Sequence, residues 1–132
     1  MPACLDHASL IASDFERSAS FYDAALGALG LARVAEFGDE EDDTADVEAV
    51  GWGPPDGQAL LWVVTGDVPT RGAHVSLRSG SRGDVERFYA AALAAGGAGR
   101  SAPRRWPIYR RGEFNAVVAD PDGNLIEAVS GE

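Results

Sequence analysis

The chain has 132 residues, 21 of them acidic and 11 of them arginine, with no lysine, so its formal net charge is −10. This length suits one compact domain and is too short for an eight-fold β/α barrel. The negative charge argues against duplex nucleic acid or an anionic membrane as the main partner. One cysteine excludes an internal disulfide, and we see no signal-like or membrane-spanning apolar run, so we expect a cytoplasmic protein.

The first predicted elements are a strand over residues 5–11 and a helix that begins near Ser13. Ser13 and Glu16 have the S-x-x-E spacing of a capping box, and apolar residues then recur at helical spacing until Gly30 provides a stop. Short runs typical of strands follow near residues 32–37, 47–51 and 58–65.

The acidic charge is concentrated in residues 36–48, which hold eight acidic side chains and no arginine. We interpret this segment as a solvated loop, and the alternative is a docking patch for a cationic ligand. The charge reverses over residues 100–111, where five arginines accompany Trp106 and Tyr109. This pattern favours a loop whose arginines face an anionic substrate group over a site for single-stranded nucleic acid.

The second half of the chain repeats the order of elements in the first. A strand is predicted around residues 75–77, and Ser81 with Asp84 resembles a helix cap before Gly96 ends the helix. Strand-like runs are again expected, near residues 98–102, 113–119 and 125–129.

Direct comparison of the two halves supports an internal repeat with an offset of 66 or 67 residues. The matching features are His7 and His74, Phe21-Tyr22 and Phe88-Tyr89, and the Pro-Asp-Gly turns at residues 55–57 and 121–123. We therefore predict an α+β fold of two βαβββ modules, residues 1–66 and 67–132. Together they would form a curved, mostly antiparallel eight-stranded sheet around a cleft.

The two histidines and one glutamate form a candidate metal site. His7 and His74 occupy equivalent positions in the two repeats, on strands that an approximate two-fold axis would bring to one cleft. Glu127 lies between apolar neighbours in the last strand, where a carboxylate is costly unless it is paired or bound to a metal. Two imidazoles and a carboxylate suit a divalent ion with open positions. The alternative is a pair of structural histidines that duplication has preserved without a metal.

The chain resembles the vicinal oxygen chelate superfamily, which includes glyoxalase I, extradiol dioxygenases, and fosfomycin- and bleomycin-resistance proteins. The stretches that carry the resemblance are Leu5-Asp6-His7, Phe21-Tyr22, residues 74–77 and residues 118–129. The resemblance implies paired βαβββ modules around a metal held by His7, His74 and Glu127. Leu61 stands where the glyoxalase I pattern has a fourth ligand, which favours the three-ligand dioxygenase and fosfomycin-transferase types.

The first hypothesis is a metal-dependent enzyme of this type, acting on a small oxygenated molecule by dioxygenase-, lyase- or transferase-like chemistry. Iron(II), manganese, nickel and zinc all suit the three ligands. Tyr109 and Arg110 are the candidates to orient or polarise the substrate; many small relatives have a Tyr-His pair where this chain has Tyr-Arg. The predicted pocket lining is Trp62, Trp106 and Phe114.

Two other hypotheses remain open. The second is a metal-free protein that sequesters a small molecule or drug, as bleomycin-resistance proteins do. The third is a transcriptional or assembly module that borrowed the fold, because fold alone does not fix function. Whichever hypothesis holds, we expect a homodimer, since two half-folds joined by a linker over residues 66–72 can exchange between protomers. Whether one site draws on one chain or two stays open.

Overall fold

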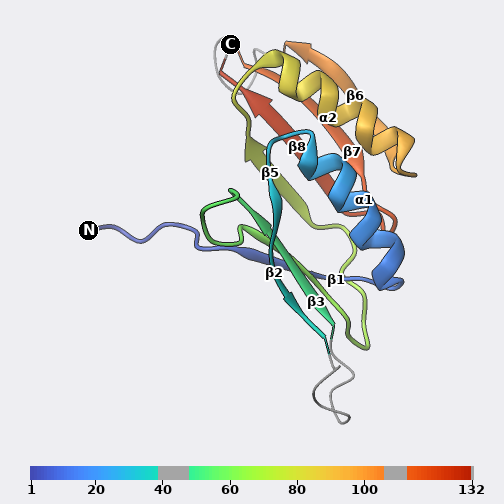
Figure 1. Cartoon of the computed structure of the whole chain (residues 1–132). Coiled ribbons are helices and arrows are strands. Elements are labelled where there is room, and N and C mark those ends of the chain that lie inside the picture. Colours follow the sequence, from blue (N-terminus) through green and yellow to red (C-terminus); the bar gives the residue numbers. More distant parts are fainter. Residues whose placement is uncertain (39–47, 106–112, 132) are drawn as a thin grey trace.

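A computed structural model describes residues 1–38, 48–105 and 113–131 (Figure 1). Within these ranges the chain forms strand, helix and three strands twice over, which confirms the predicted α+β class and order. The elements of the first half are β1 (Ala8–Ile11), α1 (Phe15–Gly27), β2 (Ala32–Phe37), β3 (Ala49–Gly53) and β4 (Leu61–Val64). Those of the second half are β5 (His74–Arg78), α2 (Arg82–Ala94), β6 (Ala98–Arg105), β7 (Phe114–Ala119) and β8 (Leu125–Ser130).

The eight described strands divide into two four-stranded sheets. The first sheet has the order β1-β4-β3-β2 and the second has the order β5-β8-β7-β6. The first strand of each sheet pairs in parallel with the last strand of the same half, and the other neighbours are antiparallel. In the view of Figure 1 the first sheet lies below the second. The helices α1 and α2 contact each other and join the two halves.

The sequence predicts the N-cap of one helix correctly and that of the other incorrectly. The cap of α2 is confirmed, because the Ser81 side chain accepts a hydrogen bond from the Asp84 backbone N–H at 3.2 Å. The capping box at Ser13 is wrong: Asp14 is the N-cap of α1 and accepts from the Arg17 N–H. The Ser13 backbone N–H and hydroxyl instead donate hydrogen bonds to the Asp122 carboxylate in the second half. Neither described helix is long and apolar enough to cross a membrane.

One continuous apolar core lies between the helices and one face of each sheet. The large side chains Phe21, Tyr22, Trp52 and Phe88 are fully buried in it together with the aliphatic residues of the central strands. Because side chains alternate along a strand, every second residue points away from this core. We call that opposite side the open face of each sheet: it carries Ser9 and Trp62 on the first sheet, and Ser76 and Glu127 on the second.

A turn in the second half, residues 120–124, binds the first half. The buried Asp120 carboxylate accepts a hydrogen bond from the Tyr22 hydroxyl at 2.6 Å and others from the turn itself, including the backbone N–H groups of Asp122 and Asn124. Asn124 also bonds Thr70 and Ala73, which lie between β4 and β5. Burial and the neighbouring carboxylate raise the pKa of Tyr22 well above its usual value, so the hydroxyl stays a donor.

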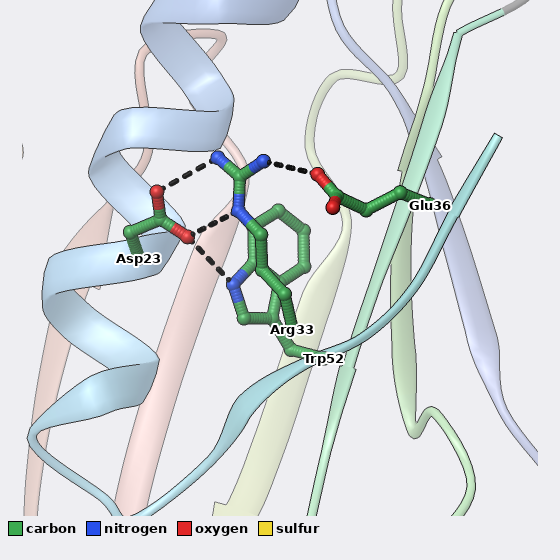
Figure 2. A network of polar contacts seen from close by, with 4 residues as sticks. All are labelled: Asp23, Arg33, Glu36 and Trp52. Atoms are coloured by element: carbon green, nitrogen blue, oxygen red, sulfur yellow. Dashed lines mark hydrogen bonds and ion pairs between the residues drawn. The ribbon is translucent and has the colours of Figure 1, made fainter. Parts of the chain in front are cut away.

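A polar network fixes α1 on the first sheet (Figure 2). The Arg33 guanidinium donates two hydrogen bonds to Asp23, at 2.8 and 2.7 Å, and one to Glu36. Trp52 adds an indole N–H bond to Asp23 at 3.0 Å. The hydrogen bonds from Arg33 are the main reason why the pKa of Asp23 lies below its usual range.

Replacing Asp23 by asparagine is expected to lower the free energy of unfolding at neutral pH by about 1 kcal/mol or less, because the ion pair is partly exposed. A carboxylate whose pKa is lower in the folded state stabilises the fold above its unfolded pKa, about 4. That stabilisation is lost as the pH falls through the folded value. Urea denaturation at several pH values should therefore show the difference between wild type and variant shrinking below about pH 4. A pH-independent difference would contradict the assignment.

Candidate functional site

His74 and Glu127 meet on the open face of the second sheet. His74 is the first residue of β5, and Glu127 pairs in register with Ser76 from the neighbouring β8. The residues on either side of Glu127, Ile126 and Ala128, are fully buried in the core, so the carboxylate must point away from the helices. The His74 Nε2 atom lies 2.9 Å from Glu127 Oε1. An imidazole and a carboxylate are thus neighbours on a face that no described helix covers.

Asn115 completes the surroundings of the carboxylate. Its side-chain Nδ2 donates to Glu127 Oε2 at 2.6 Å, from β7 on the other side of β8. Asn115 is 5 % exposed and Glu127 is held between two strands, so the carboxylate has a fixed orientation. Asn115 was not among the site residues predicted from the sequence. The available signal was the polar alternation of Glu113 and Asn115 at the start of an otherwise apolar strand.

His7 lies on the other sheet. It precedes β1 instead of lying within it, and its Nδ1 atom is 2.7 Å from Asp6 Oδ2. The imidazole borders a pocket of about 430 Å³ on the open face of the first sheet, with Gln58, Ala59 and Trp62 among its other walls. Nearly half of the His7 side chain is exposed, and 49 % of that of His74.

The three predicted ligands do not gather in one place within the described ranges. No group of three His, Cys, Asp or Glu side chains among residues 1–38, 48–105 and 113–131 is placed to hold a metal ion. The His74–Glu127 pair nevertheless supplies a nitrogen and an oxygen donor side by side, with the second carboxylate oxygen ordered by Asn115. These two residues fit two positions of a facial set for a divalent ion, and the third position needs a donor from elsewhere.

The predicted pocket residues fall into three groups. Trp62 faces the pocket beside His7, and its ring stacks on Phe37 with a centroid separation of 5.6 Å and an interplanar angle of 14°. Gly51 lies beside the indole: a Cβ there would be 2.7 Å from the Ala59 Cβ and 3.0 Å from two ring atoms, so a larger residue would force these neighbours to shift. Phe114 packs against the core beneath the Arg82 guanidinium, away from Glu127. Trp106, Tyr109 and Arg110 lie outside the described residues.

Comparison with known proteins identifies the family. The Glyoxalase/Bleomycin resistance protein/Dioxygenase superfamily model matches residues 4–128, so the chain belongs to this superfamily. A search of curated proteins finds no significant match.

Solved structures of the same family share the fold. A glyoxalase/bleomycin resistance protein from Albidiferax ferrireducens is 27 % identical, with a TM-score of 0.72 and coverage of 95 % of this chain and 96 % of that one. A glyoxalase I variant from Zea mays is 21 % identical, with a TM-score of 0.70, over 95 % of this chain and 46 % of that one. The fosfomycin resistance protein FosX from Mesorhizobium loti is 18 % identical, with a TM-score of 0.66, over 97 % and 91 % of the two chains.

Proposed function

We propose that the protein is a metal-dependent enzyme of the vicinal oxygen chelate type, acting on a small oxygenated molecule. The observation that carries the proposal is the His74–Glu127 pair on the open face of the second sheet, with Glu127 oriented by Asn115. A carboxylate in a strand otherwise packed with apolar side chains is costly to keep, and metal binding offsets that cost. Membership of the superfamily agrees with this chemistry.

His7 would supply the third donor, and we propose that it comes from a second copy of the chain. Within one chain His7 lies on the first sheet, while His74 and Glu127 lie on the second. The open faces of both sheets carry the polar and aromatic residues that a cleft needs. A homodimer that joins the first sheet of one copy to the second sheet of its partner would complete two sites.

The chain's own residues would prepare the substrate. A divalent ion, when bound, supplies a Lewis acid for two adjacent substrate oxygens. Trp62, whose ring stacks on Phe37, presents an aromatic wall beside His7 that would exclude water from an apolar part of the substrate. Tyr109 and Arg110 remain the predicted residues for orienting or polarising the reacting group.

A mixing experiment tests the shared site directly. The protein is purified without chelator or nickel resin, loaded with iron(II), manganese, nickel or zinc in turn, and analysed for bound metal. His7→Ala and Glu127→Ala should each bind no stoichiometric metal alone. Mixing the two variants under conditions that exchange subunits should restore about a quarter of the sites, because each mixed dimer then holds one complete set. Wild-type metal uptake without any restoration on mixing would place all three ligands in one chain.

A metal-free small-molecule binding protein is the second candidate. It is favoured by the direct 2.9 Å contact of His74 with Glu127, and by the absence of a three-donor group from the described part of one chain. In that function the same faces would bind a ligand without an ion. No stoichiometric uptake of any of the four metals, with ligand binding unchanged in Glu127→Ala, would establish this candidate and exclude the enzyme.

Asn115 provides a finer test of the metal site. Replacing Asn115 by leucine keeps the branching of the side chain but removes the hydrogen bond to Glu127 Oε2. We expect metal affinity to fall by about 10- to 100-fold, the effect usual for the loss of a partner that orients a ligand. Isothermal titration with the metal that wild type prefers gives the measurement. Unchanged affinity in a folded variant would show that Asn115 does not orient a metal ligand.

A further inference from the structure

A second polar group on the open face of the second sheet lies beyond the His74–Glu127 pair. Arg78 is the last residue of β5 and pairs in register with Val129, while His74 pairs with Leu125. Side chains alternate along a strand, so Arg78 shares the open face with His74 and Ser76. Its side chain is 57 % exposed. The face therefore has an imidazole at one end and a permanent cation at the other, and the Glu127 carboxylate comes from a position level with Ser76 between them.

The structure also shows what positions the Arg78 guanidinium. Its Nη2 atom donates to Glu113 Oε1 at 3.4 Å. A Cβ placed on Gly131 would lie 3.7 Å from Nη1, so the head of the side chain reaches past the end of β8 toward the C-terminus. Glu113 itself is only 8 % exposed. A nearly buried carboxylate thus anchors an arginine that extends over the sheet from an exposed position.

This arrangement leaves donors for a ligand. A guanidinium carries five N–H groups in a planar fork, and one carboxylate oxygen at 3.4 Å engages one edge of it. The fork matches the geometry of carboxylate and phosphate oxygens. Since Glu113 restricts the arginine before a ligand arrives, less side-chain entropy is lost on binding.

We propose that Arg78, positioned by Glu113, binds an oxyanion group of the substrate at the end of this open face opposite His74. The inference rests on the proposed function, which supplies the binding of the substrate's adjacent oxygens at the other end. Arg78 lies four positions along β5 from His74, about 13 Å, and two positions from Ser76, which is in register with Glu127, about 7 Å. The substrate class is then an elongated molecule with vicinal oxygens at one end and a carboxylate or phosphate-like group at the other.

The test uses probes of graded length. Monohydroxamates of succinic, adipic, suberic and sebacic acid carry a chelating group at one end and a carboxylate at the other, and their methyl esters are matched neutral controls. Calorimetry on the metal-loaded protein should show one of the longer acids binding at least about tenfold more tightly than its ester, because a guanidinium–carboxylate pair is charge-assisted. The short succinic probe should show no such preference.

Variants assign the preference to Arg78. Arg78→Gln should bind acid and ester equally, with ester affinity as in wild type, and Arg78→Lys should recover part of the preference because charge remains without the fork. Glu113→Gln should weaken the preference without removing it. Arg17→Gln, which removes an exposed charge on α1, should behave as wild type. Equal binding of acid and ester by wild type, or an unchanged preference in Arg78→Gln, would overturn the inference.

The two proposals fail in different ways. The metal content of the protein and its affinity for the esters test the proposed metal site alone, because the esters have no carboxylate for Arg78 to bind. If the protein takes up no metal and no ester binds, suberate itself is titrated and followed by NMR shifts of the β5 amides. Binding that Arg78→Gln abolishes would then support the oxyanion site without the metal, and equal shifts in both proteins would reject it.

Discussion

Replacing Glu127 by glutamine should lower the affinity for divalent metal by at least about 100-fold, more than the loss of an orienting partner does. Glutamine has nearly the same shape and can still hydrogen-bond Asn115 and His74, so the fold should persist. It lacks the negative charge that a hard or borderline ion requires. Metal content after gel filtration and calorimetric titration measure the loss, while circular dichroism reports on the fold.

Glu86→Gln is the matched control, because Glu86 is an exposed glutamate on α2. Its removal changes the net charge equally, so unchanged metal affinity in this variant separates a ligand effect from a general electrostatic one. Full metal occupancy in Glu127→Gln would remove Glu127 from the ligand set and with it the observation on which the proposed function rests.

Replacing Asp120 by alanine should lower the free energy of unfolding by about 3–5 kcal/mol, a substantial part of the stability of a small domain. The carboxylate accepts from the Tyr22 hydroxyl, from two backbone N–H groups and from the Asn124 amide. Its removal leaves a fully buried hydroxyl without its acceptor and loosens the turn that holds the two halves of the chain together. Urea denaturation at neutral pH measures the loss.

The equivalent turn of the first half provides the control. Its sequence is Pro54-Pro55-Asp56-Gly57, so proline occupies the position that corresponds to Asp120, and Asp56 is exposed. Asp56→Ala should change stability by no more than about 0.5 kcal/mol. Tyr22→Phe removes both the hydroxyl and its need for an acceptor, and should therefore be milder than Asp120→Ala. A loss below about 1 kcal/mol in Asp120→Ala would show that the turn does not tie the halves together.

Most of the fold follows from local sequence. The internal repeat predicts the order of elements, and the expected runs near residues 32–37, 113–119 and 125–129 lie within one residue of β2, β7 and β8. The start of α1 was misplaced because Ser13 and Asp14 are both good caps, and a local pattern does not show that Asp122 engages Ser13. The contact that draws Ser13 away from the cap position is a tertiary one, with a residue more than a hundred positions away along the chain.

The candidate site, like the fold, could be predicted from the sequence only in part. The apolar neighbours of Glu127 in the last strand indicated a carboxylate that needs a partner or a metal, and the structure places it beside His74. Asn115 was missed because its contact depends on the register of β7 against β8, which local sequence does not specify. The repeat made His7 equivalent to His74, yet equivalence between halves does not say which sheets face each other. The separation of His7 from His74 and Glu127 among the described residues therefore needed coordinates.

The strand pairing has a consequence for folding kinetics. Every ladder between described strands closes within one half of the chain, and each half ends by pairing its first strand with its last, Ala8 with Leu61 and His74 with Leu125. Parallel pairs between strands so far apart in the sequence form slowly. The two sheets share no ladder of hydrogen bonds between described strands, so neither sheet needs the other in order to form. The halves can therefore fold at separate rates. Cooperative unfolding then depends on the contacts that couple the halves, which are the shared apolar core, the contact between the helices and the Asp120 turn.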